Sequence, residues 1–217
     1  MNNLLKIGEY ELSQEKKKIN VLIVDNSDLN NNVIKEYLNR QERFRVVANE
    51  NRLNQELFNQ LEILLEPLVI LLFMRDSPQY DITWIKKLKK RYPNLPIIVL
   101  SEYSYVLFFH TLMEAGVNNI LNIDTSPEQI AQVIECTLDG HFFLPYSFYR
   151  KLNHITSVFT EVEIQTLELI TLDYTNIQMA KELNVTIRGV ESRLTKIYDK
   201  LEVSCRREAV KKIMQMK

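Results

Sequence analysis

The sequence predicts an α/β domain with a doubly wound, five-stranded parallel sheet, followed by a smaller all-α domain of four helices. Short apolar runs alternate with helical stretches as far as about residue 140, and no strand-like run occurs after residue 159. The length of 217 residues also exceeds the roughly 100–150 of one typical domain. We therefore expect four segments: an N-terminal extension (1–18), the α/β domain (19–140), a linker (141–158) and the helical domain (159–217).

Five short runs, rich in branched apolar side chains, are the expected strands of the sheet. They are VLIV (21–24), FRVVA (44–48), LVILL (68–72), IIVL (97–100) and NNIL (118–121). Helical stretches follow them over residues 28–40, 55–65, 83–91, 105–115 and 126–138. The last of these begins at Ser126-Pro127, where a serine N-cap precedes a proline at the first helical position. This alternation predicts the doubly wound parallel sheet.

Helix-start signals divide the C-terminal part into four helices. Thr160 and Glu163 form a capping-box pattern, as do Thr175 and Gln178, and Asn184 begins a tight turn. The third helix carries an apolar stripe of Val190, Leu194, Ile197 and Leu201, and a fourth helix covers about 206–214. Because the second and third helices are joined by a very short turn, they predict a helix-turn-helix.

Composition limits the function classes. A net charge of −1 means that any nucleic-acid surface is local, and residues 188–217 hold nine Lys/Arg against four Asp/Glu. Cys136 and Cys205 form neither a metal-binding spacing nor a disulfide framework, which fits a reducing compartment. No segment has secretory or transmembrane character. We expect a cytoplasmic protein with no cofactor, no bound metal and no membrane contact.

The helical segment FTEVEIQTLELI…TNIQMAKELNVTIRGVESRLTKIYDKLEVSCRREAV resembles the LuxR/NarL (FixJ-type) DNA-binding domain without a gap. The resemblance implies a four-helix domain that binds pseudo-palindromic, double-stranded DNA and dimerises through its last helix, at Ala209, Val210 and Ile213. It implies base-reading side chains at Glu191, Ser192 and Thr195. The other expected DNA contacts are Thr175, Thr186, Arg188, Arg193, Lys196 and Lys200.

Glu191 stands where many members of that family have lysine. A glutamate can accept a hydrogen bond from cytosine N4, so it predicts a changed base preference. The alternative is weaker DNA affinity, because a carboxylate repels phosphate. We favour the first reading because Arg188, Arg193 and Lys196 surround Glu191 with positive charge.

Residues 20–140 resemble a receiver domain with the flavodoxin-like strand order, through VLIVDN, PLVILLF, IIVLS and AGVNNILNIDTSPEQI followed by DGHFFLP. In receivers an aspartate that ends the third strand is phosphorylated, and acidic residues hold the Mg²⁺ that the transfer needs. Aligned without gaps, this sequence has Phe73 at the acceptor position. The remaining positions read Asp25-Asn26 for the acidic pair, Ser101 for the hydroxyl, Ile123 for the lysine and Ile120 for the switch aromatic.

These substitutions predict an atypical response regulator with a pseudo-receiver. It would bind promoter DNA as a dimer, without aspartyl phosphorylation and without being an enzyme. Its receiver-like domain would serve dimerisation, a protein partner or a small-molecule effector. We expect Phe73 to be buried over the place of a phosphoryl group, near Asp25, Ser101 and Ile123. Two alternatives stay open: an auxiliary protein-interaction regulator with weak DNA binding, and a receiver phosphorylated at a displaced aspartate such as Asp76.

Overall fold

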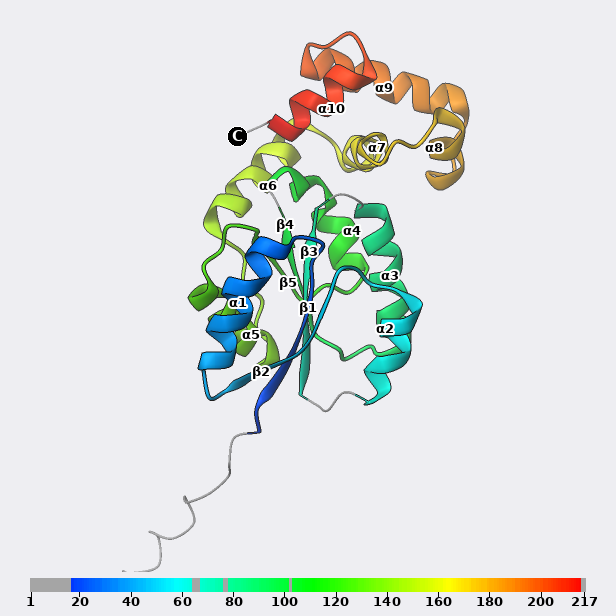
Figure 1. The fold of residues 1–217 in the computed structure, drawn as a ribbon. Helices are drawn as coiled ribbons and strands as arrows, with labels where there is room; N and C mark the ends of the chain where they lie inside the picture. Colours follow the sequence, from blue (N-terminus) through cyan, green and yellow to red (C-terminus); the bar gives the residue numbers. More distant parts are fainter. Residues whose placement is uncertain (1–16, 64–66, 76–77, 102, 216–217) are drawn as a thin grey trace, which may run out of the picture.

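The N-terminal part of the chain is built on a single parallel sheet. The computed structural model describes residues 17–63, 67–75, 78–101 and 103–215 (Figure 1). Five strands lie in the order β2-β1-β3-β4-β5 and all pair in parallel. They are β1 (Ile19–Val24), β2 (Phe44–Glu50), β3 (Leu68–Met74), β4 (Ile97–Ser101) and β5 (Asn119–Asn122). The predicted strands and the flavodoxin-like order are confirmed. Residues 1–16 of the expected N-terminal extension, and Asp76, lie outside the described residues.

Helices cover both faces of the sheet. Helices α1 (Asp28–Arg40) and α5 (Pro127–Leu138) pack together on one face, and Figure 1 shows the other helices of this part on the opposite side. These are α2 (Gln55–Gln60), η1 (Leu61–Ile63), α3 (Pro78–Arg91), η2 (Tyr103–Phe108) and α4 (Phe109–Glu114). Helix α3 begins five residues earlier than predicted, because Pro78 suits the first turn of a helix.

Strand β3 lies in the middle of the core. All seven of its residues are buried, which confirms that this strand is covered on both faces. Because side chains alternate along a strand, Leu72 and Met74 pack into the cluster on the α2–α4 face. Leu71 and Phe73 pack into the cluster on the α1–α5 face. The ring of Phe73 therefore points toward α1 and α5.

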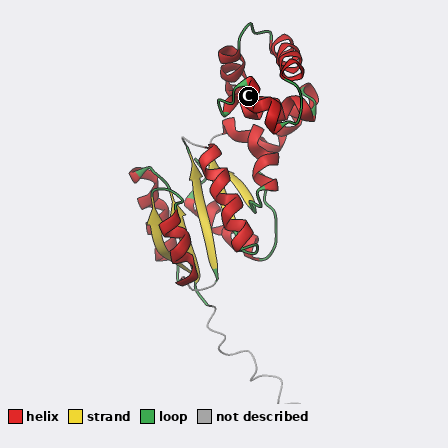
Figure 2. Cartoon of the chain, turned by 90° about the vertical axis from the view of Figure 1, so that its right-hand side faces the viewer, coloured by secondary structure: helices red, strands yellow, loops and turns green. Residues whose placement is uncertain are grey.

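The C-terminal part is entirely helical, as Figure 2 shows. Both predicted capping boxes form, at Thr160 with Glu163 and at Thr175 with Gln178. Asn184 has a φ of 51°, the left-handed conformation that a tight turn requires. The helices are α6 (Tyr146–Val158), α7 (Glu161–Thr171), α8 (Asn176–Glu182), α9 (Ile187–Leu201) and α10 (Arg206–Gln215). Helices α8 and α9 form the predicted helix-turn-helix. No helix within the described ranges is long and apolar enough to cross a membrane.

The segment expected to be a linker contains a full helix, α6. Phe148 and Ile155 of α6 are buried, and the Phe148 ring lies 5.7 Å from that of Phe109, centroid to centroid. Phe148 therefore packs against α4 of the α/β domain. The other four aromatic side chains are exposed: Phe142, Phe143, Tyr146 and Tyr149.

The helical domain rests on the carboxyl edge of the sheet, where η2 and α4 contact it (Figure 1). Thr111 of α4 donates a 2.7 Å hydrogen bond to Glu168 of α7. Gln79 of α3 donates a 2.8 Å bond to the Tyr174 hydroxyl. One apolar cluster continues from the α2–α4 face of the sheet through η2 into α7, α9 and α10. The two parts therefore share a continuous core.

Candidate functional site

Asp25, the first residue after β1, is held by an arginine. The Arg75 Nε atom lies 2.9 Å from Asp25 Oδ1, and Nη2 lies 3.3 Å from Oδ2. The backbone N–H of Ser27 also donates to Oδ1, at 3.0 Å. The Asp25 side chain is 0% exposed and that of Arg75 is 23% exposed. A carboxylate this deeply buried requires such a charge partner and these hydrogen bonds.

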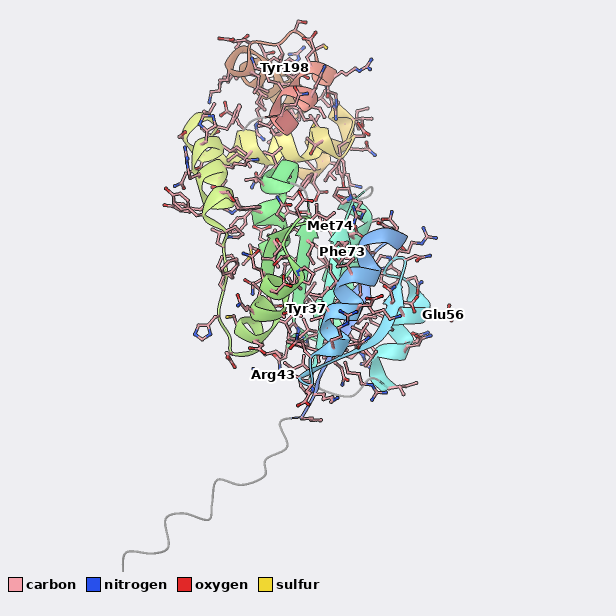
Figure 3. All side chains as sticks on the ribbon, turned by 60° about the vertical axis from the view of Figure 1, so that its left-hand side comes forward. Tyr37, Arg43, Glu56, Phe73, Met74 and Tyr198 are labelled. Carbon is pink, nitrogen blue, oxygen red and sulfur yellow. The ribbon has the colours of Figure 1, made fainter. Side chains whose placement is uncertain are left out.

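Phe73, the residue expected at the acceptor position, lies one residue before the end of β3. The residue is 4% exposed, and it shares an apolar cluster with Ile123, the residue expected at the lysine position. The Arg75 guanidinium carbon lies 5.8 Å from the centroid of the Phe73 ring. Figure 3 labels Phe73 beside Met74, which points to the other face of the sheet. A phenyl ring offers no nucleophile, so this position cannot accept a phosphoryl group.

The other predicted positions of this pocket lie at the same edge of the sheet. Ser101 ends β4 and is buried, and its hydroxyl has no hydrogen-bond partner within the described part of the chain. Its carbonyl accepts a 3.0 Å bond from the N–H of Ile123. Ile120 is buried in β5 and adds no polar group. The structure thus brings Asp25, Phe73, Ser101 and Ile123 to one edge.

Arg75 was not identified from the sequence. Its position two residues beyond Phe73 carried the signal, because residues i and i+2 at a strand end lie on the same face. An arginine there reaches back to the aspartate that ends the neighbouring strand, β1, which pairs with β3 through Val24 and Leu72. The cation beside Asp25 is therefore an arginine directly after β3, whereas Ile123 occupies the position where a lysine was expected after β5.

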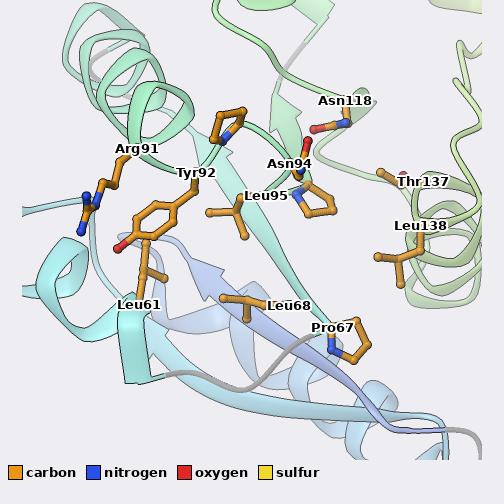
Figure 4. Close-up of a pocket in the computed structure, with 12 residues that line it drawn as sticks. Leu61, Pro67, Leu68, Arg91, Tyr92, Asn94, Leu95, Asn118, Thr137 and Leu138 are labelled. Carbon is orange, nitrogen blue, oxygen red and sulfur yellow. The ribbon is translucent and has the colours of Figure 1, made fainter.

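A cavity of about 290 Å³ lies beside the ion pair. Its polar lining comes from the segments that follow β1, β2 and β3 and from α3: Asn26, Asn51, Arg52, Arg75, Tyr80 and Asp81. A cavity of about 770 Å³ lies at the opposite, amino edge of the sheet, between Pro67, Tyr92, Asn118 and Leu138 (Figure 4). The larger cavity is therefore separate from the Phe73 pocket.

The predicted DNA-facing residues lie on the outer side of α9 and at two helix starts. The apolar stripe of α9 is buried, which turns the opposite side outward. Exposed there are Thr175, Thr186, Arg188, Glu191, Ser192, Thr195 and Lys196, and Arg193 is half-buried. The hydroxyl of Thr186 caps α9 by accepting from the N–H of Gly189 at 3.1 Å, and Thr175 caps α8 in the same way. Helix N-termini with exposed N–H groups favour phosphate.

Lys200, which is also predicted to contact phosphate, is exposed and makes two contacts within its own domain. Its Nζ atom lies 2.7 Å from Glu163 Oε2 and 3.0 Å from the carbonyl oxygen of Val158. Burial alone would raise the pKa of Glu163, but the hydrogen bonds from Lys200 and Thr160 outweigh it and lower the pKa below its ordinary value. Lys200 therefore joins α9 to the start of α7.

The side chains expected at a dimer contact of α10 are also placed differently. Ala209 and Ile213 are buried within the chain's own core, and Val210 is half-buried. Helix α10 packs on α7, α9 and η2. The assignment of Ala209 and Ile213 to a contact with a second copy does not fit this arrangement, because the chain itself already covers both side chains.

Glu168 is the buried acid of the contact between the two parts. It is 8% exposed, Thr111 donates to its Oε2, and its Oε1 has no hydrogen-bond partner within the described residues. The pKa of Glu168 is raised to about 7, mainly by burial; the Thr111 bond opposes this shift, and the nearby charge of Glu114 adds to it. The contact therefore favours the protonated acid near neutral pH.

A receiver-type parallel sheet followed by a helix-turn-helix domain defines a DNA-binding response regulator. Residues 157–213 match the family described as bacterial regulatory proteins, luxR family. The helical domain thus matches this family, and the chain as a whole is a DNA-binding transcription regulator of the response-regulator type.

Relatives and solved structures agree with this class. The chain is 26% identical to response regulator protein VraR of Staphylococcus saprophyticus, over 88% of this chain and 94% of VraR. It is 27% identical to transcriptional regulatory protein YdfI of Bacillus subtilis, over 90% of this chain and 95% of YdfI. A solved structure of two RcsB dimers bound to DNA shares the fold, with a TM-score of 0.62, 23% identity, and coverage of 92% of this chain and 100% of that one.

Proposed function

We propose that this regulator controls transcription as an atypical response regulator, without phosphorylation of an aspartate in its receiver-like domain. The observation that carries the proposal is the pair formed at the β3 end: buried Phe73 at the acceptor position, and Arg75 bound to Asp25. Each feature opposes a different requirement of phosphoryl transfer.

Phosphoryl transfer to a receiver needs a carboxylate nucleophile and a metal ion held by neighbouring acids. Phe73 supplies no nucleophile. Both oxygens of Asp25 accept hydrogen bonds from Arg75, so a metal ion at Asp25 would have to displace a cation of the chain itself. Ile123 supplies no positive charge to bind a phosphoryl oxygen. Three separate changes thus point in one direction.

The regulator would bind DNA as a dimer. The RcsB structure described as two dimers on DNA supports this, together with the exposed outer face of α9. Pseudo-palindromic half-sites require two copies of such a domain. Since Ala209 and Ile213 of α10 are buried in the chain's own core, a dimer contact through these two side chains would require α10 to separate from that core.

A second function of the receiver-like domain is effector binding. The cavity beside Arg75 supports it, because about 290 Å³ is at the lower end of ligand-sized pockets and its lining mixes apolar side chains with arginine and asparagine. The auxiliary-factor alternative draws on the exposed Glu191 in α9. Asp76, the displaced phosphorylation candidate, lies outside the described residues.

The test is incubation of the full chain with acetyl phosphate and Mg²⁺, followed by intact-mass spectrometry and DNA-binding anisotropy. We expect no phosphoryl adduct and an unchanged affinity for a selected DNA site. Phe73→Asp should also fail to take up phosphate efficiently, because Arg75 and Ile123 are unchanged. A stable adduct on the wild-type chain would contradict the proposal, and peptide mapping would show whether Asp76 carries it.

A further inference from the structure

Helix α3 carries a concentrated positive charge outside the DNA-binding domain. Residues 86–91 read KKLKKR, and no acidic residue occurs between positions 82 and 101. Lys89 turns inward and donates to the carbonyl of Leu95 at 2.7 Å and to Asn118 at 2.9 Å. The other four cations are exposed: Lys86, Lys87, Lys90 and Arg91. Within the described ranges, Lys86, Lys87 and Lys90 form no ion pair.

An aromatic groove lies against this charge, between α2 and α3. It encloses about 370 Å³, and its lining is Gln55, Phe58, Trp84, Lys87, Lys90 and Arg91. The rings of Phe58 and Trp84 lie 6.4 Å apart, centroid to centroid, and those of Phe58 and Tyr92 lie 5.8 Å apart. The groove thus combines an apolar floor with a rim that holds three cations and no carboxylate.

We propose that this α2–α3 groove docks an acidic, amphipathic segment of a partner protein. Apolar side chains of the segment would contact Phe58 and Trp84, and its carboxylates would face Lys87, Lys90 and Arg91. The proposal stands apart from the absence of phosphorylation, because the groove lies between two helices on the side of the sheet away from Phe73.

The geometry favours such a segment over nucleic acid. A DNA backbone has no apolar group to fill the floor of the groove. Stacked bases would need a ring face of Trp84, and the Lys87 ammonium already lies 4.3 Å from the centroid of that ring. The recognition helix α9, in addition, belongs to the other domain, beyond the carboxyl edge of the sheet (Figure 1).

The groove continues toward the helical domain. Trp84 and Lys87 also line a hollow of about 680 Å³ that reaches the turn after α7, at Thr171, Leu172 and Asp173. A segment longer than the groove would therefore contact both domains. Such a partner would bind across the contact that Gln79 and Tyr174 make.

The sequence offers its own reporter, since Trp84 is the one tryptophan among its 217 residues. The probe is a fluorescein-labelled helical peptide of about 16 residues, with leucine and phenylalanine on one face and glutamate elsewhere. We expect saturable anisotropy, a change in Trp84 emission, and binding that weakens as salt rises from about 50 mM to about 500 mM. A peptide with lysine in place of glutamate should not bind.

The decisive variant combines Lys87→Glu with Lys90→Glu. We expect it to lower peptide affinity about tenfold or more. Its affinity for a selected DNA site should stay within about twofold of the wild-type value. The matched control, Lys18→Glu with Lys35→Glu, makes the same change of charge at exposed sites away from α3. Absence of peptide binding, or equal loss in both variants, would overturn the proposal. So would displacement of the peptide by random duplex DNA whose binding depends on Lys87 and Lys90, which would assign the groove to nucleic acid.

Discussion

Arg75 holds both carboxylate oxygens of Asp25, through bonds of 2.9 Å and 3.3 Å that close the pocket next to the Phe73 ring. The pair is buried on the Asp25 side and partly exposed on the Arg75 side. Such pairs are sensitive to the loss of one member, because the remaining charge stays buried without compensation.

Arg75→Ala should lower the free energy of unfolding by about 3 kcal/mol, because it removes the arginine that neutralises the buried Asp25 carboxylate. Urea unfolding followed by circular dichroism measures the change. The control is Arg75→Ala combined with Asp25→Asn, which removes the charge as well as its partner. We expect the double variant to be more stable than Arg75→Ala alone; strictly additive effects would show that the pair is not coupled.

Glu191→Lys should raise affinity for random DNA and change the selected base preference. Replacing an anion by a cation on the exposed face of α9 should steepen the salt dependence by up to about two phosphate equivalents. Anisotropy titrations across a salt series measure the slope, and binding-site selection measures the preference. An unchanged slope together with an unchanged site would mean that residue 191 does not face DNA.

Lys196→Ala and Lys200→Ala should affect different properties, DNA affinity and fold stability, although the two lysines lie on the same helix. The first should weaken DNA binding and reduce the salt slope by about one, since Lys196 is exposed beside the recognition face. The second should instead destabilise the fold by about 1–2 kcal/mol. This is less than for a fully buried ion pair, because the Lys200 side chain is 37% exposed and solvent screens its charge. Parallel DNA titrations and thermal melts separate the two roles. A loss of DNA affinity without loss of stability in Lys200→Ala would instead support the predicted phosphate contact of Lys200.

Stability should fall as pH rises from about 4.5 to about 7, through the contribution of Glu168. The pKa of Glu168 is raised from 4.5 to about 7 in the folded chain, so the folded state binds this proton more tightly than the unfolded state. Between these two pH values the unfolded state ionises first, and the free energy of unfolding falls. The full effect is of the order of 3 kcal/mol. Glu168→Gln should remove this part of the pH dependence, as measured by the difference between wild-type and variant unfolding curves across the window. A difference in free energy of unfolding between wild type and Glu168→Gln that stays constant across this pH range would contradict the raised pKa of Glu168.

Much of the fold follows from local pattern. The strands and the two capping boxes were predictable because apolar runs and Thr-x-x-Glu/Gln signals act over a few residues. The strand order was predicted from the resemblance to a receiver domain. Helix α6 and the split of the fourth helical stretch into η2 and α4 were not predicted. There, Val106, Leu107 and Phe108 are all buried because both the sheet and the helical domain cover them. Such two-sided burial depends on a docking that periodicity does not encode.

The site divides in the same way. The prediction that Phe73 replaces the acceptor aspartate came from one position in an aligned strand. The replacement cation was not, because Arg75 and Asp25 are 50 residues apart and meet only through the pairing of β3 with β1. The bond between Lys200 and Glu163 was not predicted for a related reason: Glu163 is 37 residues away, at the start of another helix. Contacts that depend on tertiary geometry were therefore the ones missed.

The Asp25–Arg75 pair also has a consequence for the duration of the regulator's response. The phosphorylated state of a receiver has a limited lifetime, because hydrolysis of the acyl phosphate returns the pocket to its resting state. An arginine built into the chain is neither added nor removed after synthesis, so the pocket that it neutralises has no decay rate of its own. If Arg75 fixes the pocket as proposed, the duration of a response would be set by how long each copy of the protein persists and by how long its partners and DNA remain bound.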